Sequence, residues 1–232
     1  MEDSKYDIDP SIVNRRGIYK DVYGSGPGRE WSDYRLRPNF LIAMVVAPEL
    51  FDEHHALYAL QLADRVLRGP LGMKSLDPAD MHYRPIFDNL IDSNDPWIAK
   101  GMSYHNVGIS VGASHCIAYF FFQGPEWGWL LGYFLRAYLF FDTRVGEGKT
   151  VSYREHLECC SLHTTSFQDP TQTLHRLHRV LLTPCNHIRS DPWASLPELT
   201  NENGTFCRDA CNSQAWSVST MLDFLEEAYK HT

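Results

Sequence analysis

The sequence predicts an all-α fold, in which five helices alternate with long loops. In five segments the apolar residues recur at the i, i+3, i+4, i+7 spacing that places them on one face of a helix. Proline or glycine lies near the ends of several of these segments, and the alternation typical of strands is scarce. Such helix–loop–helix alternation suits a helical array or an α/α toroid, in which paired helices pack side by side and the loops at one end form a site.

The first two helices are predicted between residues 39 and 70. The apolar run of residues 39–50 indicates a short helix that ends or bends near Pro48, because proline lacks the N–H that the next turn needs. The segment 51–70 carries one apolar stripe and stops at Gly69-Pro70, a usual exit signal. The stripe consists of Ala56, Ala59, Leu60, Ala63, Val66 and Leu67.

Two long segments without helical periodicity flank these helices. Residues 1–38 are charged and glycine-rich, so we expect a loop, of which residues 1–11 form a flexible N-terminal segment. Residues 71–104 are rich in Asp, Pro and Gly, yet they also carry large aromatic side chains. Because loops longer than about 12–15 residues in a compact domain are usually functional, we expect this loop to contribute to a site.

Three further helices are predicted in the second half of the chain. One begins at residues 124–125, with Pro125 in its first turn. Another begins at residues 169–170 and breaks at Pro184, and the last begins near residue 212. Their apolar stripes are Trp127, Leu130, Leu131, Phe134, Leu135 and Tyr138; Leu174, Leu177 and Leu181; and Ala215, Val218, Leu222, Leu225 and Tyr229.

The composition limits the classes of partner. The chain of 232 residues has 29 acidic and 21 basic residues, a formal net charge of −8 and a pI near 5.7. Nucleic-acid binding and polybasic membrane anchoring depend on clustered Lys and Arg, so we expect neither nucleic acid nor a membrane as partner. The sequence has no run of about 20 apolar residues, and its acidic start does not resemble a secretory signal. We therefore expect a cytoplasmic protein.

We expect neither a metal nor any other cofactor. Six cysteines in a chain without a secretory signal are typical of reduced thiols rather than of a disulfide framework. The pairs Cys207–Cys211 and His175–His178 have spacings that suit a metal on one helical turn, but no second pair completes a set of four ligands. We favour buried thiols and histidines on a helix surface.

Two predicted loops combine aromatic side chains with carboxylates. The first contains Glu126 and Trp127, with His105 upstream, and the second contains Glu198 and Glu202. An aromatic ring can stack on a pyranose face while oxygens and N–H groups bind its hydroxyls, so this combination suits a sugar site. Hydrolysis of a glycoside needs two carboxyl groups, one to protonate the leaving oxygen and one to activate water or to attack directly.

Each of these residues also has a purely structural interpretation. Glu126 would lie in a first helical turn, where a carboxylate interacts favourably with the helix dipole. The rings of Trp127 and Trp216, which lies shortly after the second loop, are more often core aromatics than sugar platforms. Asp77 and Asp80 suit turn chemistry, and the two glutamates of the second loop suit solvated charges.

The same residues resemble those of the glycogen debranching enzyme family. The resemblance covers most of the chain, from about residue 12 to 226, and the matches occur in the family's order. They are residues 14–21 (NRRGIYKD), 33–40 (DYRLRPNF), 42–50 (IAMVVAPEL), 69–78 (GPLGMKSLDP), 123–127 (QGPEW), 132–137 (GYFLRA), 196–203 (LPELTNEN) and 214–217 (QAWS).

This resemblance implies a fold, an activity and roles for several residues. The family combines a 4-α-glucanotransferase with an amylo-α-1,6-glucosidase, an (α/α)6 toroid that hydrolyses branch-point glucose with inversion. Residues 12–232 would be the C-terminal part of that glucosidase domain, with glycogen or limit dextrin as substrate. By analogy with related toroid glycosidases, Glu198 is the general base that activates water, and Glu202 is the runner-up. The residues that would contact substrate are His105, Glu126, Trp127, Asp77, Asp80 and Trp216.

The chain departs from the family in two places. The aspartate that serves as general acid lies upstream of residue 14 in the family and has no counterpart here, so we expect the chain to be inactive without that upstream portion of the enzyme. Residues 106–122, which carry no charge, separate His105 from the motif at 123–127 that follows it directly in the family. This segment is either a lineage-specific hairpin or lid, or, as we favour, a translated intron.

Functions of different classes therefore compete. The leading hypothesis is a C-terminal fragment of a glycoside hydrolase that removes α-1,6-linked glucose in glycogen breakdown. The alternatives are a non-catalytic polyglucan-binding or interaction module and an unrelated helical scaffold. Co-sedimentation with glycogen separates them, because binding without hydrolysis supports the module and the loss of both supports a non-functional fragment.

Overall fold

The structure is a computed structural model that describes residues 13, 15–27, 30–87, 98–99, 124–147 and 170–230. This part is mainly helical, as the sequence predicts, and no helix in it is long and apolar enough to cross a membrane. Its α-helices are α1 (Phe40–Val46), α2 (Glu53–Val66), α3 (Gly128–Glu147), α4 (Pro170–Ser190) and α5 (Ala215–Tyr229). Short 3-10 helices occupy Glu30–Tyr34 (η3), Pro48–Leu50 (η4) and Glu202–Gly204 (η6).

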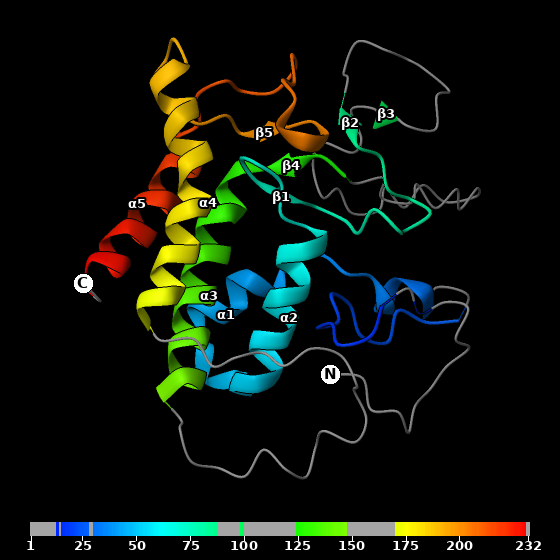
Figure 1. Ribbon diagram of the computed structural model, residues 1–232. Helices are drawn as coiled ribbons and strands as arrows, with labels where there is room; N and C mark the ends of the chain where they lie inside the picture. The colour runs from blue at the N-terminus through cyan, green and yellow to red at the C-terminus, as the bar shows by residue number, and fades with distance from the viewer. Residues whose placement is uncertain are drawn as a thin grey trace.

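Helix α3 is the central element of the bundle and packs against α1, α2, α4 and α5 (Figure 1). Its sequence is apolar around most of its circumference, and a helix of this kind is stable only when other elements surround it. Phe134, Leu135, Tyr138 and Phe141 are each at most 1% exposed, so the core of the protein is built around this helix.

The first two helices confirm the predictions from the sequence. Helix α1 ends before Pro48, and the chain continues as the short helix η4. Helix α2 begins at the N-cap Asp52, whose carboxylate accepts the backbone N–H of His55 at 2.9 Å. The predicted stripe packs into the core, with Leu60 and Ala63 fully buried.

Helix α4 shows that the predicted break at Pro184 is wrong, because the helix continues to Ser190. A proline inside a helix removes one backbone hydrogen bond and costs about 3 kcal/mol. Pro184 itself is buried, and Cys185 and Ile188, which follow it, pack against the core. This packing offsets the loss and holds the last turns of α4 in place.

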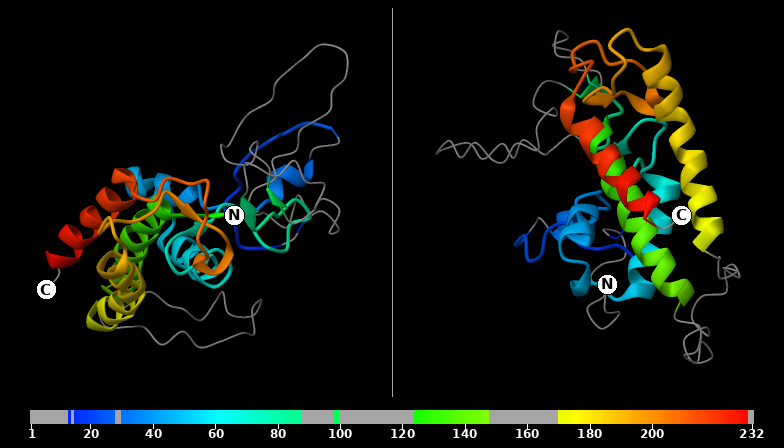
Figure 2. Two further views of the ribbon diagram at one scale, coloured as in Figure 1. Left: turned by 90° about the horizontal axis from the view of Figure 1, so that it is seen from above. Right: turned by 90° about the vertical axis from the view of Figure 1, so that its left-hand side faces the viewer.

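A small layer of strands covers one end of the helix bundle (Figures 1 and 2). It consists of β1 (Met73–Lys74), β4 (Glu126–Trp127) and β5 (Leu199–Thr200), paired antiparallel in the order β1-β4-β5. A separate parallel pair is formed by β2 (Ile86–Phe87) and β3 (Ile98–Ala99). The helix predicted from residues 124–125 therefore begins later, at Gly128, because Glu126 and Trp127 are paired with strands on both sides.

Helix α5 lies at the outer edge of the bundle (Figure 2), and it packs on α3 with a face other than the predicted one. The buried side chains are Ser217, Thr220, Met221 and Phe224. Val218 of the stripe predicted as the core face does pack against the core, but the rest faces outwards, since Leu222 is 58% exposed, Leu225 43% and Tyr229 80%. The prediction of this face is wrong because α5 has two apolar faces, and the described part of the chain covers only the one against α3.

Candidate active site at the strand end of the bundle

The strand layer is organised around the buried carboxylate of Glu126, which is 0% exposed. Its Oε1 accepts the backbone N–H of Asn203 at 2.9 Å, and its Oε2 accepts that of Gly204 at 3.1 Å. The hydroxyl of Thr200 donates to Oε2 at 3.3 Å, and the ammonium of Lys74 lies 3.7 Å from Oε1. Through these interactions the carboxylate of Glu126, which belongs to β4, connects β4 to β1 and to the loop after β5.

The local sequence explains how a carboxylate can occupy this position. Asn203 and Gly204 both have left-handed backbones, with φ of +60° and +70°, and such consecutive residues direct neighbouring N–H groups toward one anion. Gly69 lies on the other side of the Glu126 carboxyl group, so closely that a Cβ at that position would overlap it. The motifs around residues 69, 126 and 203 are thus adjacent in space although they are distant in sequence.

The electrostatics of Glu126 reflect its burial. Removal from water raises the pKa of its carboxyl group, while the charge of Lys74 and the N–H groups of Asn203 and Gly204 act in the opposite direction. The result is a carboxyl group held inside the protein that supports the 200–204 loop.

Glu198, the predicted general base, lies one residue before β5 and is half-buried. Its backbone N–H donates to the carbonyl of Cys211 at 2.8 Å, and its own carbonyl accepts the N–H of Gly128 at 2.9 Å. Gly128 is the first residue of α3, so the backbone of Glu198 is fixed to the start of the central helix. A carboxylate on this backbone is held in place and still reaches solvent.

Glu202, the runner-up, is bound to the loop that precedes β2. Its side chain accepts the hydroxyl of Tyr83 at 3.1 Å, and its backbone N–H donates to the carbonyl of Pro85 at 3.0 Å. Burial, followed by the charges of Glu202 and Glu126, raises the pKa of Tyr83, so this phenol remains a hydrogen-bond donor.

Asp77 and Asp80 are buried and paired with arginines. Asp77 is 1% exposed and forms a two-pronged ion pair with Arg15, and it also accepts the N–H of Ala79 at 2.8 Å. Burial by itself would raise the pKa of Asp80, but hydrogen bonds from His82 and the charge of Arg35 hold that pKa below its ordinary value. Both aspartates therefore fix the conformation of the loop after β1.

The predicted aromatic residues differ in exposure. The ring of Trp127 is half-buried and contacts both the main core and a small cluster that contains Phe87 and Leu199. The ring of Trp216 is 49% exposed and stacks on Trp129, with centroids 4.0 Å apart and planes 15° apart. His105 and the proposed insertion 106–122 lie outside the described residues, as does the segment 1–11.

The structure adds Lys74 and Tyr83 to the residues predicted from the sequence. Both contact carboxylates of the layer, Lys74 that of Glu126 and Tyr83 that of Glu202. The available signal for Lys74 was a lone charge in the otherwise uncharged stretch 69–76. No group of three or more His, Cys, Asp or Glu side chains in the described part is arranged to hold a metal.

Fold and site together define a mainly helical protein with carboxylates gathered at one end of its bundle. The family model of amylo-alpha-1,6-glucosidase matches residues 3–223, and the chain therefore belongs to that family. It is also 40% identical to the glycogen debranching enzyme of Saccharomyces cerevisiae over 230 residues, which is 98% of this chain. The resemblance found in the sequence is thus confirmed. The chain spans only 13% of the length of that relative.

Proposed function

We propose that this chain is the C-terminal part of an amylo-α-1,6-glucosidase that hydrolyses α-1,6-linked branch-point glucose in glycogen. Membership of the family supports this reaction, and the yeast relative is named for debranching. The observation that carries the proposal is the position of Glu198, whose half-buried side chain stands on a backbone bonded to Cys211 and to the start of α3. A general base needs this combination of fixed position and access to water.

In the proposed mechanism Glu198 takes a proton from a water molecule as the water attacks the anomeric carbon. A carboxylic acid from the upstream portion of the enzyme protonates the glycosidic oxygen as its bond to that carbon breaks. The configuration inverts because water attacks the face opposite the leaving group, which requires the two carboxyl groups to lie about 6.5–9.5 Å apart.

Supporting roles are proposed for the other carboxylates. Glu126 holds the 200–204 loop next to Glu198, while Asp77 and Asp80 hold the loop after β1. Glu202 remains the runner-up as base, and its carboxylate accepts the Tyr83 hydroxyl. Substrate contacts by His105, Trp127 and Trp216 remain predictions.

The outer face of α5 supports the need for an upstream portion. A helix with two apolar faces is typical of a buried position, yet Leu222, Leu225 and Tyr229 are exposed in the described part. We propose that upstream helices of the same enzyme cover this face and complete an (α/α)6 toroid. The 13% coverage of the yeast relative is consistent with such a portion. Residues 12–232 would then be a partial domain, with 106–122 as an insertion, in a cytoplasmic enzyme.

The test is glucose release from a phosphorylase limit dextrin, measured for the chain alone and for the chain completed with the upstream portion. We expect release only from the completed enzyme, and a loss of about 10²–10⁴-fold in kcat for Glu198→Gln, the usual contribution of a general base. Glu202→Gln tests the runner-up, and Glu49→Gln, which changes an exposed carboxylate of η4, is the matched control.

Two outcomes would contradict the proposal. Full activity of the completed Glu198→Gln enzyme would remove Glu198 from the mechanism. A completed protein that sediments with glycogen and releases no glucose would support the non-catalytic binding module instead.

A further inference from the structure

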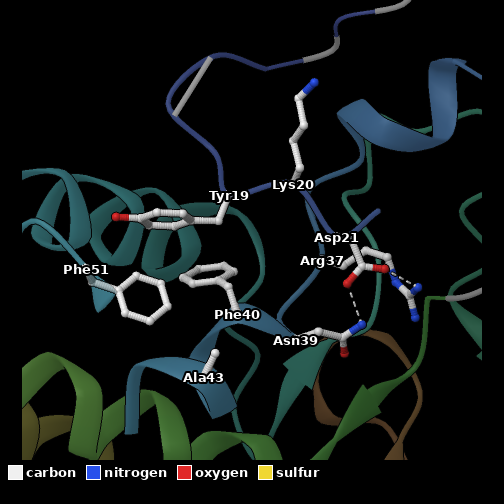
Figure 3. Close-up of a pocket in the computed structure, with 8 residues that line it drawn as sticks. All are labelled: Tyr19, Lys20, Asp21, Arg37, Asn39, Phe40, Ala43 and Phe51. Carbon is white, nitrogen blue, oxygen red and sulfur yellow. Dashed lines mark hydrogen bonds and ion pairs between the residues drawn. The ribbon is translucent and has the colours of Figure 1, made fainter. Parts of the chain in front are cut away.

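A cavity of about 310 Å³ is lined by residues 19–21, by residues 37–43 at the start of α1 and by Phe51, and contains none of the carboxylates discussed above. Figure 3 shows that aromatic side chains line one side of it and polar side chains the other. Its volume is at the lower end of the range of about 300–1,000 Å³ that is typical of small-molecule sites.

The aromatic side of the cavity is formed by Tyr19, Phe40 and Phe51. The ring centroid of Tyr19 lies 5.7 Å from that of Phe40 and 5.0 Å from that of Phe51, and the second pair is edge-to-face. Phe40 is only 9% exposed and Phe51 also contacts Phe141 of the core. These contacts make the apolar wall rigid.

The polar side of the cavity is a fixed network of three side chains. The carboxylate of Asp21 accepts a guanidinium N–H of Arg37 at 2.6 Å and the amide N–H of Asn39 at 2.6 Å (Figure 3). The side chains of Arg37 and Asp21 are only 13% and 11% exposed. A carboxylate, a guanidinium and an amide are therefore held facing the cavity before any ligand arrives.

The charges indicate a neutral, polar ligand. Asp21 neutralises Arg37 within the cavity wall, and Lys20 extends away from the network (Figure 3). A small anion would gain little net attraction here, and burying an unpaired charge is costly. An apolar ligand would shield this network from water without using its remaining hydrogen-bonding capacity, which is also costly.

We propose that this cavity binds one glucose unit of an α-1,4-glucan at a place separate from the hydrolytic site. The apolar face of the pyranose lies against Tyr19 and Phe40, and its hydroxyls bind Asp21, Arg37 and Asn39. The choice of glucose among neutral polar ligands rests on the function proposed above.

Two hydrogen bonds link the cavity to the strand layer. Arg37 Nε donates to the carbonyl of Ser75 at 3.4 Å, and the N–H of Ser75 donates to the carbonyl of Pro125 at 3.2 Å. Lys74 and Glu126 are the adjacent residues. A glucose unit bound in the cavity would therefore anchor the glucan next to the layer that carries Glu198.

The experiment measures maltotriose binding by calorimetry, both for the 232-residue chain and for the chain completed with the upstream portion. Ala43→Trp places a large ring at the cavity, and Ala43 is exposed, so no core packing is lost. Val46→Trp on the same helix is the matched control, because Val46 is 73% exposed and does not line the cavity. Asn39→Ala removes one polar contact and keeps the aromatic wall.

We expect Ala43→Trp to weaken maltotriose binding at least about tenfold, Asn39→Ala to weaken it less, and Val46→Trp to leave it unchanged. Absence of binding, equal binding in all variants, or loss of binding when the upstream portion is added would each overturn the proposal. The completed Glu198→Gln enzyme separates the two proposals, because it should bind maltotriose as the wild type does and release glucose from the limit dextrin about 10²–10⁴-fold more slowly. Glucose release without binding at the cavity would refute this inference alone.

Discussion

Charged side chains are buried at the strand end of the bundle, whereas apolar side chains are exposed along the outer face of α5. Glu126 is 0% and Lys74 9% exposed, while Leu222 is 58% and Tyr229 80% exposed. Both arrangements oppose the general tendency of charges to face water and of large apolar groups to avoid it.

The strand layer and the outer face of α5 differ in whether the described part of the chain supplies neighbours for their side chains. In the described part of the chain, the Glu126 carboxylate has polar partners in Lys74, Thr200, Asn203 and Gly204. The outer face of α5 has no comparable cover there. Within the described residues the buried charge thus has its partners, whereas the exposed apolar surface is the one that, under the proposal above, an upstream part of the enzyme would cover.

Removal of the Glu126 carboxylate is expected to have the largest effect. Glu126→Ala leaves the ammonium of Lys74 buried without a counter-ion and two backbone N–H groups without an acceptor, so we expect a loss of about 3–5 kcal/mol in the free energy of unfolding. Urea denaturation measures it, with Glu226→Ala as the exposed control. A loss as small as that of the control would show that the layer does not depend on this carboxylate.

The next prediction concerns the close packing of the inner face of α5 against α3. A Cβ at Gly132 of α3 would overlap the backbone of Thr220, whose hydroxyl donates to the carbonyl of Trp129 at 2.9 Å. Gly132→Ala normally favours a helix, but here it forces the helices apart, and we expect a net cost of about 1–3 kcal/mol. Thermal unfolding checks this, with the exposed Ser219→Ala as control. Stabilisation by Gly132→Ala would contradict the close packing.

Periodicity in the sequence predicted the positions of the helices better than it predicted which of their faces are buried and where they end. All five helices occur, because apolar spacing and capping residues are local properties of the chain. The exposed stripe of α5 and the continuation of α4 beyond Pro184 depend on which neighbours supply packing, and spacing does not contain this information. The two-residue strands gave no signal either, since strands of this length show no alternation.

For the candidate site, too, the sequence predicted the residues but not their contacts. The carboxylates Glu126, Glu198 and Glu202 were identified from the residue types of two loops, and the structure places both loops in one strand layer. What the sequence did not show is that the ring of partners around Glu126 comes from segments as distant as Gly69 and Gly204. Such contacts exist only after the chain has folded.

The pH dependence of stability gives a second test of the buried layer. Burial raises the pKa of Glu126 in the folded protein, so its protonated form is favoured by folding. Its contribution is fully present below the ordinary pKa of glutamate and is lost as the pH rises through the folded pKa. Relative to Glu126→Gln, which stays neutral, the wild type should therefore lose stability as the pH increases, as measured by urea denaturation at several pH values. A difference that is constant with pH would contradict the shift.

Substitutions on the outer face of α5 should change the stability of the isolated chain least. Leu222→Ser and Leu225→Ser change side chains that are already largely in water, so we expect unfolding free energies within about 0.5 kcal/mol of the wild type. In the completed enzyme the same changes would place hydroxyls in a covered interface and should lower the midpoint of thermal unfolding. Leu50→Ser, at an exposed leucine of η4, serves as control in both proteins. Equal, small effects in both would mean that the upstream portion does not cover this face, because burial is the only property of these residues that completion of the enzyme would change.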